Sequence, residues 1–449
     1  MTKLLQKQLK IFIFFAFLCP ALLLSACGGA AAAAETSSPT AAETSAPAAY
    51  ESSGTSAAES LQSPDTQGFF SSRDMDPSYD EAAAIPIRLT GSTALCDSNA
   101  VSVNNGQITL LEEGVYLLSG TLDEGQILVN AGDSAKVQIV LSGAEITSAS
   151  SAAIYCKEAD KLFITLAAGT DNRLANGGSF VPLDESNIDA VIFSKADLTL
   201  NGEGSLTVDS PAGHGIVSKD ELTITGGSYT LTAARHGFTG KDSVAIAGGS
   251  FHITAGKDAI HSDAALLICA GSFTIPDCYE GLEGLSVTIE GGSLDITSRD
   301  DGINAASGAD GSGTARGFGP QDPFAVDEDC SITINGGSIT IVSDGDCIDS
   351  NGSLTVNGGN LKLTCNGNGN TAIDVNGTFS NNGGSITTND GSESATGGQG
   401  GRGAMGGGKG GMGGEKPFGM EKGSGRMPPE SGQQRPEAAP PELEAGATA

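Results

Sequence analysis

The chain has 449 residues, of which 54 are Asp or Glu and only 23 are Lys or Arg, so its formal net charge is −31. It lacks the clustered Lys and Arg that hold a nucleic-acid backbone or an anionic lipid surface, and we expect no nucleic-acid partner. The 65 glycines, together with few aromatic residues and no Trp, are typical of a chain with many short strands and turns.

The first 26 residues have the pattern of a lipoprotein signal peptide. Three lysines precede an apolar run that begins at Ile11, and Leu24–Cys27 follows as a lipobox, whose cysteine becomes the lipidated N-terminus. The apolar run is too short to span a bilayer, which argues against a simple membrane anchor. We therefore expect an extracellular protein that is held at the outer face of the cell membrane by a lipid on Cys27.

Two further segments have a composition typical of disorder. Residues 27–86 are dominated by Ala, Ser, Thr, Pro and Glu, and residues 391–449 are rich in Gly, Met and Pro. Neither segment buries enough apolar surface to offset its chain entropy. We expect a flexible stalk, one folded domain over residues 87–390, and a disordered tail.

The folded region repeats one phrase along its length. GGSYTLT begins at Gly226, GGSFHIT at Gly248 and GGSLDIT at Gly291, and a second phrase starts at 22-residue steps from His214 to Glu280. Such a constant period indicates a solenoid, because one unit alone cannot bury its apolar face. One interval of 45 residues is interpreted as a coil plus an insertion at residues 305–327.

Within each unit the apolar residues alternate, which predicts strands. Leu222 and Ile224 form one alternating pair, and Tyr229 and Leu231 form another, with Tyr229 facing the core. Three short strands joined by Gly and Asx turns make one coil, and the paired glycines supply positive φ at the corner. The sequence therefore predicts an all-β, right-handed parallel β-helix solenoid. A β-sandwich is the weaker alternative, since its strands need not recur at constant spacing.

Several stretches together resemble a known family. The lipobox, the acidic stalk, GVYLLSGTL, KVQIVLSGAEI, FITLAAGTDNRL, HGIVSKDELTITGG and the Gly-rich tail are similar to the clostridial carbohydrate-binding β-helix family. The resemblance covers residues 87–390. It implies a catalytically silent relative of β-helical pectate lyases that carries calcium and binds cellulose-like or pectin-like polymers.

Acidic residues recur at equivalent positions of successive coils. Stacked coils lie about 4.8 Å apart, so unpaired carboxylates in one column repel each other unless they are protonated or bridged by a cation. Calcium is the natural bridge, because it accepts six to eight oxygen ligands. A single Asp-Gly here is more simply a turn. Asp258 and Asp263 are weaker ligand candidates, and the expected ligands are Glu280, Glu283, Asp300, Asp301, Asn304, Asp344, Asp346 and Asp349.

A neighbouring column places Arg235, Lys257 and Tyr279 one coil apart, and these are the candidate substrate-binding residues. The two cations suit the carboxylates of a uronic-acid polymer, although ion pairing with Asp258 or Glu280 explains them equally well. The histidines of the phrases are expected to be ordinary surface turn residues.

Seven cysteines remain after the signal peptide and Cys27 are set aside. Their odd number and spacing suggest neither a disulfide framework nor a zinc site, so we expect buried free thiols. Cys347 and Cys365 are the pair to test first for a bridge.

The leading functional hypothesis is a monomeric, lipid-anchored polysaccharide-binding protein that uses calcium and has no catalytic activity. Its partner would be an acidic, polygalacturonate-like polymer or a cellulose-like one, with the acidic polymer favoured because the chain has no Trp platform. The main alternative is a calcium-dependent lyase with Arg235, Lys257 or Arg299 as base. A surface spacer or adhesin is the third possibility.

Overall fold

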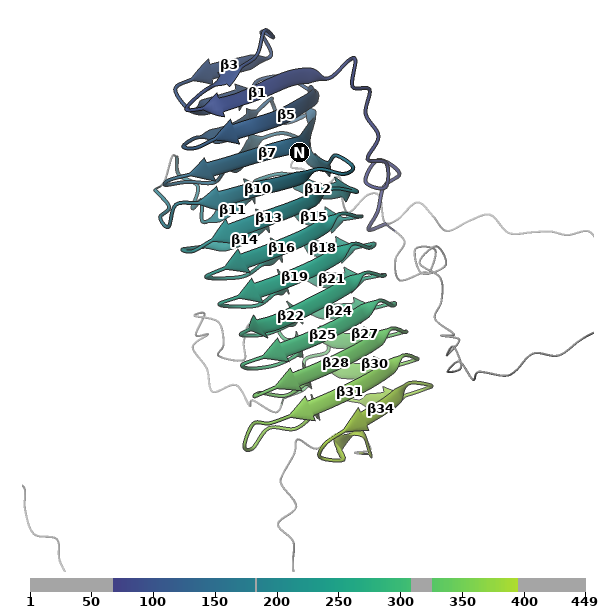
Figure 1. The fold of residues 1–449 in the computed structure, drawn as a ribbon. Coiled ribbons are helices and arrows are strands. Elements are labelled where there is room, and N and C mark those ends of the chain that lie inside the picture. Colours follow the sequence, from purple (N-terminus) through teal and green to yellow (C-terminus); the bar gives the residue numbers. More distant parts are fainter. Residues whose placement is uncertain (1–67, 182–183, 308–324, 395–449) are drawn as a thin grey trace, which may run out of the picture. The chain divides into compact units, whose positions relative to one another are not determined.

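The computed structural model describes residues 68–181, 184–307 and 325–394 (Figure 1). The signal peptide, Cys27, the first part of the expected stalk, most of the insertion at residues 305–327 and nearly all of the tail lie outside these ranges. None of the described helices is long and apolar enough to cross a membrane.

The described chain forms parallel β-coils, which confirms the predicted β-helix. Each coil contributes one strand to each of three faces, and we number the faces in the order in which the chain visits them. Face one contains β6 (Gln126–Asn130), β8 (Ile154–Glu158), β11 (Ala190–Ser194), β14 (His214–Ser218), β17 (Phe238–Gly240), β20 (Ile260–Ser262), β23 (Leu282–Gly284), β26 (Ile303–Ala305), β29 (Ile348–Ser350) and β32 (Ile373–Val375).

Faces two and three belong to one continuous sheet. Face two contains β9 (Lys161–Leu166), β12 (Asp197–Gly202), β15 (Glu221–Ile224), β18 (Ser243–Ile246), β21 (Ala265–Ile268), β24 (Ser286–Ile289), β27 (Ser331–Ile334), β30 (Ser353–Val356) and β33 (Phe379–Asn381). Face three contains β10 (Asp171–Asn176), β13 (Ser205–Ser210), β16 (Ser228–Ala233), β19 (Ser250–Ala255), β22 (Ser272–Cys278), β25 (Ser293–Ser298), β28 (Ser338–Ser343), β31 (Asn360–Cys365) and β34 (Ser385–Thr388), after which η2 (Ser392–Ser394) ends the described chain.

The N-terminal end of the stack is closed by antiparallel pairs. The first elements are β1 (Ile85–Gly91), β2 (Ala94–Leu95), β3 (Val101–Asn104), β4 (Gln107–Leu110), β5 (Gly114–Leu122) and β7 (Lys136–Ser148). β1 pairs with β2, and β3 pairs with β4, both antiparallel. These hairpins occupy an edge that would otherwise present free backbone groups to another chain.

The register of the coils follows the sequence period. Phe238 pairs with Ile260, 22 positions later, and Ile303 pairs with Ile348, 45 positions later. The long interval is therefore one coil with an insertion between adjacent strands, as the repeat predicted. At the corner between faces two and three the second glycine of the phrase adopts positive φ, for example +99° at Gly227, which a side chain would strain.

The core consists of inward-pointing residues stacked on their equivalents in the next coil. Tyr229, Phe251 and Phe273 stack in sequence, with ring centroids 5.3 and 4.5 Å apart. Tyr229 is 2% exposed, as its alternation predicted. The seven cysteines of the described chain are all free thiols, and only Cys96 is not fully buried.

Part of the segment expected to be a stalk instead packs against the solenoid. Residues 68–84, which we call the strap, extend along face two, and Phe69 and Phe70 pack on Ala245, Leu267 and Cys269. This difference has a physical reason, because the strap carries the aromatic pair and a buried Asp74 that the residues before it lack.

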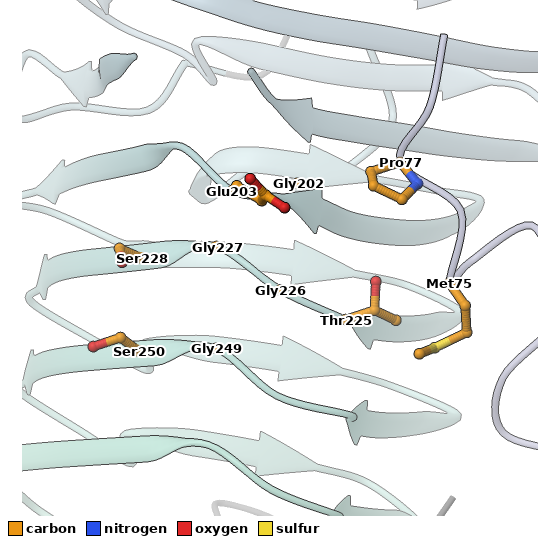
Figure 2. Close-up of a pocket in the computed structure, with 10 residues that line it drawn as sticks. All are labelled: Met75, Pro77, Gly202, Glu203, Thr225, Gly226, Gly227, Ser228, Gly249 and Ser250. Atoms are coloured by element: carbon orange, nitrogen blue, oxygen red, sulfur yellow. The ribbon is translucent and has the colours of Figure 1, made fainter. Parts of the chain in front are cut away.

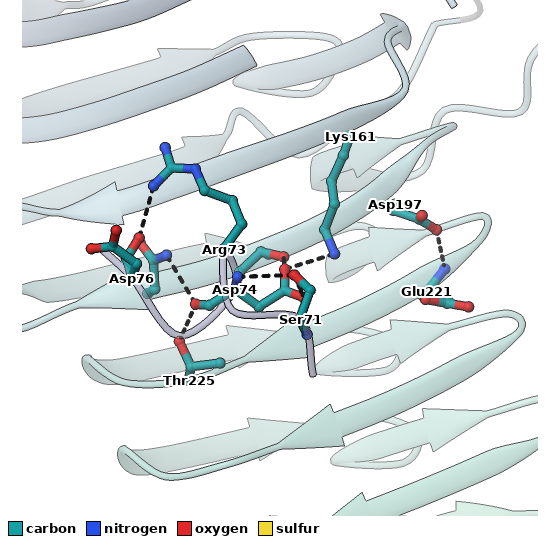
Figure 3. Close-up of polar contacts among 10 residues, drawn as sticks. Ser71, Arg73, Asp74, Asp76, Lys161, Asp197, Glu221 and Thr225 are labelled. Carbon is teal, nitrogen blue, oxygen red and sulfur yellow. Dashed lines mark hydrogen bonds and ion pairs between the residues drawn. The ribbon is translucent and has the colours of Figure 1, made fainter. Parts of the chain in front are cut away.

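Asp74 binds the strap to the solenoid through an ion pair and hydrogen bonds (Figure 3). The carboxylate lies 2.7 Å from Lys161 Nζ and accepts a hydrogen bond from Thr199 Oγ1. The main-chain carbonyl of Asp74 accepts a hydrogen bond from Thr225 Oγ1. Burial alone would raise the pKa of the Asp74 carboxyl, but Lys161, Thr199 and Ser71 outweigh it and lower the pKa.

Candidate functional site

The turn from face three to the next face one carries a column of polar residues. Main-chain bonds from Gly237 to Asp258, from Gly281 to Asp301 and from Gly302 to Asp346 hold successive turns in register. The outward strand positions of face one are aligned as His261, Glu283, Asn304, Asp349 and Asp374. We call Asp258, Glu280, Asp301 and Asp346, together with these five strand residues, the acid edge.

His261 lies between the carboxylates of its own and the next coil. Its Nδ1 is 3.0 Å from Asp258 Oδ2 and 2.5 Å from Glu283 Oε2, and its Nε2 is 3.1 Å from Asp263 Oδ1. Burial opposes a charge on His261, but these partners outweigh it and raise the pKa of His261 to about 12. His236 and His261 likewise outweigh burial at Asp258 and hold the pKa of that carboxyl well below its usual range.

The histidines of the turn phrases differ from the expected exposed turn residues. The rings of His214 and His236 are stacked 4.9 Å apart, and those of His236 and His261 are 4.7 Å apart. Their side chains are only 14%, 21% and 20% exposed. The prediction of surface histidines was wrong for these three because the turn column faces the strand column, so each ring is enclosed by the neighbouring coils.

Glu280 is the most deeply buried acid of the edge, at 2% exposed. Asn304 donates a hydrogen bond to it at 3.2 Å, and the buried Oδ1 of Asn304 has no hydrogen-bond partner. Burial, reinforced by the charges of Asp258 and Glu283, raises the pKa of Glu280 to about 9. Burial also raises the pKa of Glu283 to about 7. Full ionisation of these carboxylates would thus place more negative charge here than their protein neighbours neutralise.

The next two coils place Asp301 beside Asp346. The Asp346 backbone N–H donates to Asp301 Oδ1 at 2.7 Å, and the Thr371 N–H donates to Asp346 Oδ1. Burial, followed by the charge of Asp349, raises the pKa of Asp301 to about 8, and burial raises that of Asp346 to about 6. A Cβ on Gly345 would lie 2.5 Å from Asp301 Oδ1 and 2.7 Å from Asp300 Oδ1, so only a glycine here lets these two carboxylates pack so close to the main chain.

The closest groups of potential ligand atoms both include Asp258. Among the residues that the structure describes, sets of three His, Cys, Asp or Glu ligand atoms within 4.8 Å of one another are His236–Asp258–His261 and Asp258–Glu280–Glu283. The sequence ranked Asp258 behind the Asp301 and Asp346 region. Of that region, Asp300 and Asp301 pack closely against Gly345, whereas Asp344 is exposed.

The expected substrate-binding residues occupy one column beside the acid edge. Main-chain bonds connect Arg235 to Lys257 and Lys257 to Tyr279. Arg235 is 55% exposed and lies 3.5 Å from Asp189, which sequence reasoning missed because the coils before residue 200 have no clear 22-residue phrase. Lys257 Nζ lies 5.1 Å from the centroid of the Tyr279 ring. A hydrogen bond to Asp300, ahead of burial, raises the pKa of Tyr279 to about 12.

Arg299, the third candidate base, is held by other groups. Its Nε lies 3.1 Å from Asp277 and donates to the Cys278 carbonyl, and its guanidinium also donates to the carbonyls of Ala255 and Gly256. These contacts give Arg299 a structural role across three coils.

A groove of about 500 Å³ lies at a different corner, between the strap and the turns from face two to face three (Figure 2). Met75 and Pro77 of the strap form one wall, and corner glycines, Thr225, Ser228, Ser250 and Glu203 form the rest. This lining offers neither a cation for a uronate nor an aromatic ring for a neutral sugar. The acid edge is therefore the stronger candidate site.

Comparison with known proteins places the chain among carbohydrate-binding proteins. A family model described as "Carbohydrate-binding domain-containing protein" matches residues 104–369 and 267–405. A protein of that description from Acetivibrio thermocellus is 38% identical over 137 residues, which cover 30% of this chain and 48% of the relative. The match thus spans about half the length of this curated relative.

A solved structure with a similar sequence was also found. It is described as a polysaccharide lyase-like protein from C. thermocellum, in a gadolinium derivative. The two chains are 27% identical, the alignment covers 68% of this chain and 94% of that one, and the TM-score is 0.39.

Proposed function

Because this chain belongs to the family of carbohydrate-binding domain-containing proteins, we propose that it binds an acidic polysaccharide along the acid edge without cleaving it. The observation that carries the proposal is the stack of carboxyl groups that burial and mutual repulsion keep from ionising together, beside the exposed Arg235 and Lys257. An anionic polymer would approach such an edge only if a cation bridged the carboxylates of the protein and those of the polymer.

Calcium fits the residues of the edge. The donors from Glu280 to Asp349 are carboxylate and amide oxygens, and the buried Asn304 Oδ1 lacks a partner that a cation would supply. The close approach of the Asp300 and Asp301 carboxylates to each other at Gly345 also supports the proposal, because a cation would offset their repulsion. The ligands we propose are Glu280, Glu283, Asp300, Asp301, Asn304, Asp344, Asp346 and Asp349. The ion would neutralise these groups and offer free coordination positions to uronate oxygens.

The cations beside the edge would orient the polymer. Arg235 is more than half exposed, and its ion pair with Asp189, at 3.5 Å, leaves other guanidinium donors for a uronate carboxylate. Lys257 and Tyr279 present an ammonium group and a ring one and two coils further along. Successive coils would therefore contact successive parts of an extended chain.

The proposal includes the location of the protein. A lipid on Cys27 would hold the solenoid at the outer face of the cell membrane, where a polysaccharide is accessible. The lipobox is the supporting observation. Metabolic labelling with a radioactive fatty acid should label the wild type and not Cys27→Ser.

The test is affinity electrophoresis of the full-length chain through gels that contain polygalacturonate. We expect retardation with calcium and none with EDTA. Asp301→Asn and Asp346→Asn should reduce retardation and weaken calcium binding by at least about 10-fold, a loss typical even of residues that only support metal ligands. Asp295→Asn, an exposed acid on face three, is the matched control and should behave like wild type.

Other outcomes would contradict the proposal in distinguishable ways. Retardation by a cellulose derivative alone would indicate a neutral polymer. Appearance of the unsaturated uronate product would establish a lyase, with Arg235 or Lys257 as the base to test. Failure to bind either polymer would leave a spacer or adhesin.

A further inference from the structure

Three of the four histidines of the chain lie ring against ring beside the N-terminal part of the acid edge, and two of them converge on one carboxylate. We propose that His236, Asp258 and His261 form a site for a divalent transition-metal ion of the zinc type. This site lies at the end of the acid edge that contains the imidazoles, and Glu283 is the one residue that it shares with the proposed calcium ligands. It does not depend on the proposed function, since its argument rests on His236, Asp258, His261 and the groups that contact them.

The three ligand atoms are close together before any ion is present. His236 Nδ1 lies 2.7 Å and His261 Nδ1 lies 3.0 Å from the same oxygen, Asp258 Oδ2. All three atoms lie within 4.8 Å of one another. Zinc binds nitrogen and carboxylate oxygen at about 2.0–2.2 Å in tetrahedral geometry, so ligand atoms need to be roughly 3.3 Å apart. Each nitrogen would have to move away from Asp258 Oδ2 by roughly 0.3–0.6 Å to reach that spacing.

The surroundings of His261 resemble those of a metal-bound imidazole. When Nδ1 binds a metal, Nε2 carries the proton, and here Nε2 lies 3.1 Å from the carboxylate of Asp263. A carboxylate that accepts the second ring N–H fixes the tautomer and the orientation of a ligating histidine. Asp263 is therefore a positioning residue in the proposed site.

Candidates for the fourth ligand are present at the same place. Glu283 Oε2 lies 2.5 Å from His261 Nδ1. Thr239 is aligned with His261 on the neighbouring strand, and its buried Oγ1 has no hydrogen-bond partner. A buried hydroxyl without a partner is costly, which is an independent indication that something polar is bound nearby.

The two ends of the acid edge offer different types of ligand, and these types suit different ions. Imidazole favours zinc, copper, nickel and cobalt, whereas calcium prefers oxygen ligands alone. His236 and His261 stand at one part of the column, and only carboxylates and one amide follow from Glu280 onward. The imidazoles would therefore select a zinc-type ion over calcium at their end of the edge, even though Glu283 borders both groups of ligands.

The test is metal binding by the full-length chain in the presence of millimolar calcium. After equilibration with Zn²⁺ and removal of excess metal, wild type should retain one zinc ion per chain. Co²⁺ in its place should give the visible absorption of a tetrahedral site with nitrogen ligands. His236→Gln and His261→Gln should each abolish retention, and Asp263→Asn should weaken it about 10–100-fold.

His252→Gln is the matched control, because His252 is an exposed residue of β19 outside the stack. Circular dichroism reports whether each variant is folded, and the exposed Asp263→Asn keeps the test decisive if a buried variant unfolds. Retention of zinc by the folded His236 and His261 variants, or its absence from wild type, would overturn the proposal. The histidines would then serve only as counter-charges for Asp258 and Glu283.

Discussion

At the scale of single residues, Asp74 determines whether the strap stays on the solenoid. It is 2% exposed, and its partners come from face two: Lys161 at 2.7 Å, Thr199, and Thr225 through the main chain. Arg73 adds a contact with the Phe163 ring at 5.0 Å. A short polar segment is thus held by a few buried interactions that depend on one another.

We predict that Asp74→Asn releases the strap. The change keeps the side-chain shape but leaves the Lys161 ammonium group without its carboxylate, which typically costs about 3–5 kcal/mol for a buried pair. Limited proteolysis within residues 68–84 should accelerate at least about 10-fold. Asp76→Asn, an exposed acid of the same strap, should not change the rate. Equal resistance of Asp74→Asn and wild type would show that the apolar contacts of Phe69 and Phe70 suffice.

At the scale of the strand and coil, the aromatic stack from Tyr229 to Phe273 continues through three neighbouring strands of face three. Phe251 is its centre and also contacts Phe238 of face one edge-on, with centroids 5.9 Å apart. Each coil therefore depends on its neighbours for the burial of its largest side chain, as expected for a solenoid.

Phe251→Ala should lower the stability of the domain by about 3–5 kcal/mol, because it leaves a cavity between two rings that cannot close up. Phe251→Leu should reduce the stability less than Phe251→Ala does, since leucine fills part of the volume of the ring. Urea denaturation measures both, and Thr274→Ala, an outward position on β22, is the control. A cost for Phe251→Ala no larger than that for Thr274→Ala would contradict a role for the stack.

The coil was largely predictable because every repeat buries apolar residues at the same positions and turns at the same glycines. The 22-residue phrase gave the three strands, the glycine corners and the alignment of Glu283, Asn304 and Asp349 in one column. A column does not specify rotamers, however, so the sequence did not reveal that His261 turns toward both Asp258 and Glu283. The docking of the strap was also missed, since Asp74 finds partners on coils that only the fold brings together.

At the scale of the whole domain, the acid edge links stability to pH. The pKa values of Glu280, Asp301 and Glu283 are raised to about 9, 8 and 7, chiefly by burial. The folded chain therefore binds protons that the unfolded chain has released above pH about 4–5. The protons bound by the folded chain stabilise it at low pH, and this part of the free energy of unfolding is lost as pH rises through these pKa values. The raised pKa of His261 acts in the same direction above pH about 6.5.

In EDTA we therefore expect the melting temperature to fall between pH 6 and pH 9. Calcium should restore it, and the increase should be larger at pH 9, where the carboxylates are charged. Burial is the main cause of the lowered pKa of His214. This shift changes the free energy of unfolding only below pH about 6.5, at the acidic end of the range tested. Differential scanning fluorimetry with and without calcium measures the effect. A melting temperature that rises toward pH 9 in EDTA would show that repulsion between ionised carboxylates of the acid edge does not destabilise the domain.

The strap also determines where a mechanical load enters the domain. Within the described residues, the first contacts of the strap with the solenoid are those of Phe69 and Phe70 with β18 and β21, several coils away from β1. Tension applied from upstream would therefore pull on the side of the stack and reach the Asp74–Lys161 pair before it reached the first strand. If a lipid on Cys27 holds the chain as proposed, the strap would detach first and the tether would lengthen while the coils stayed folded.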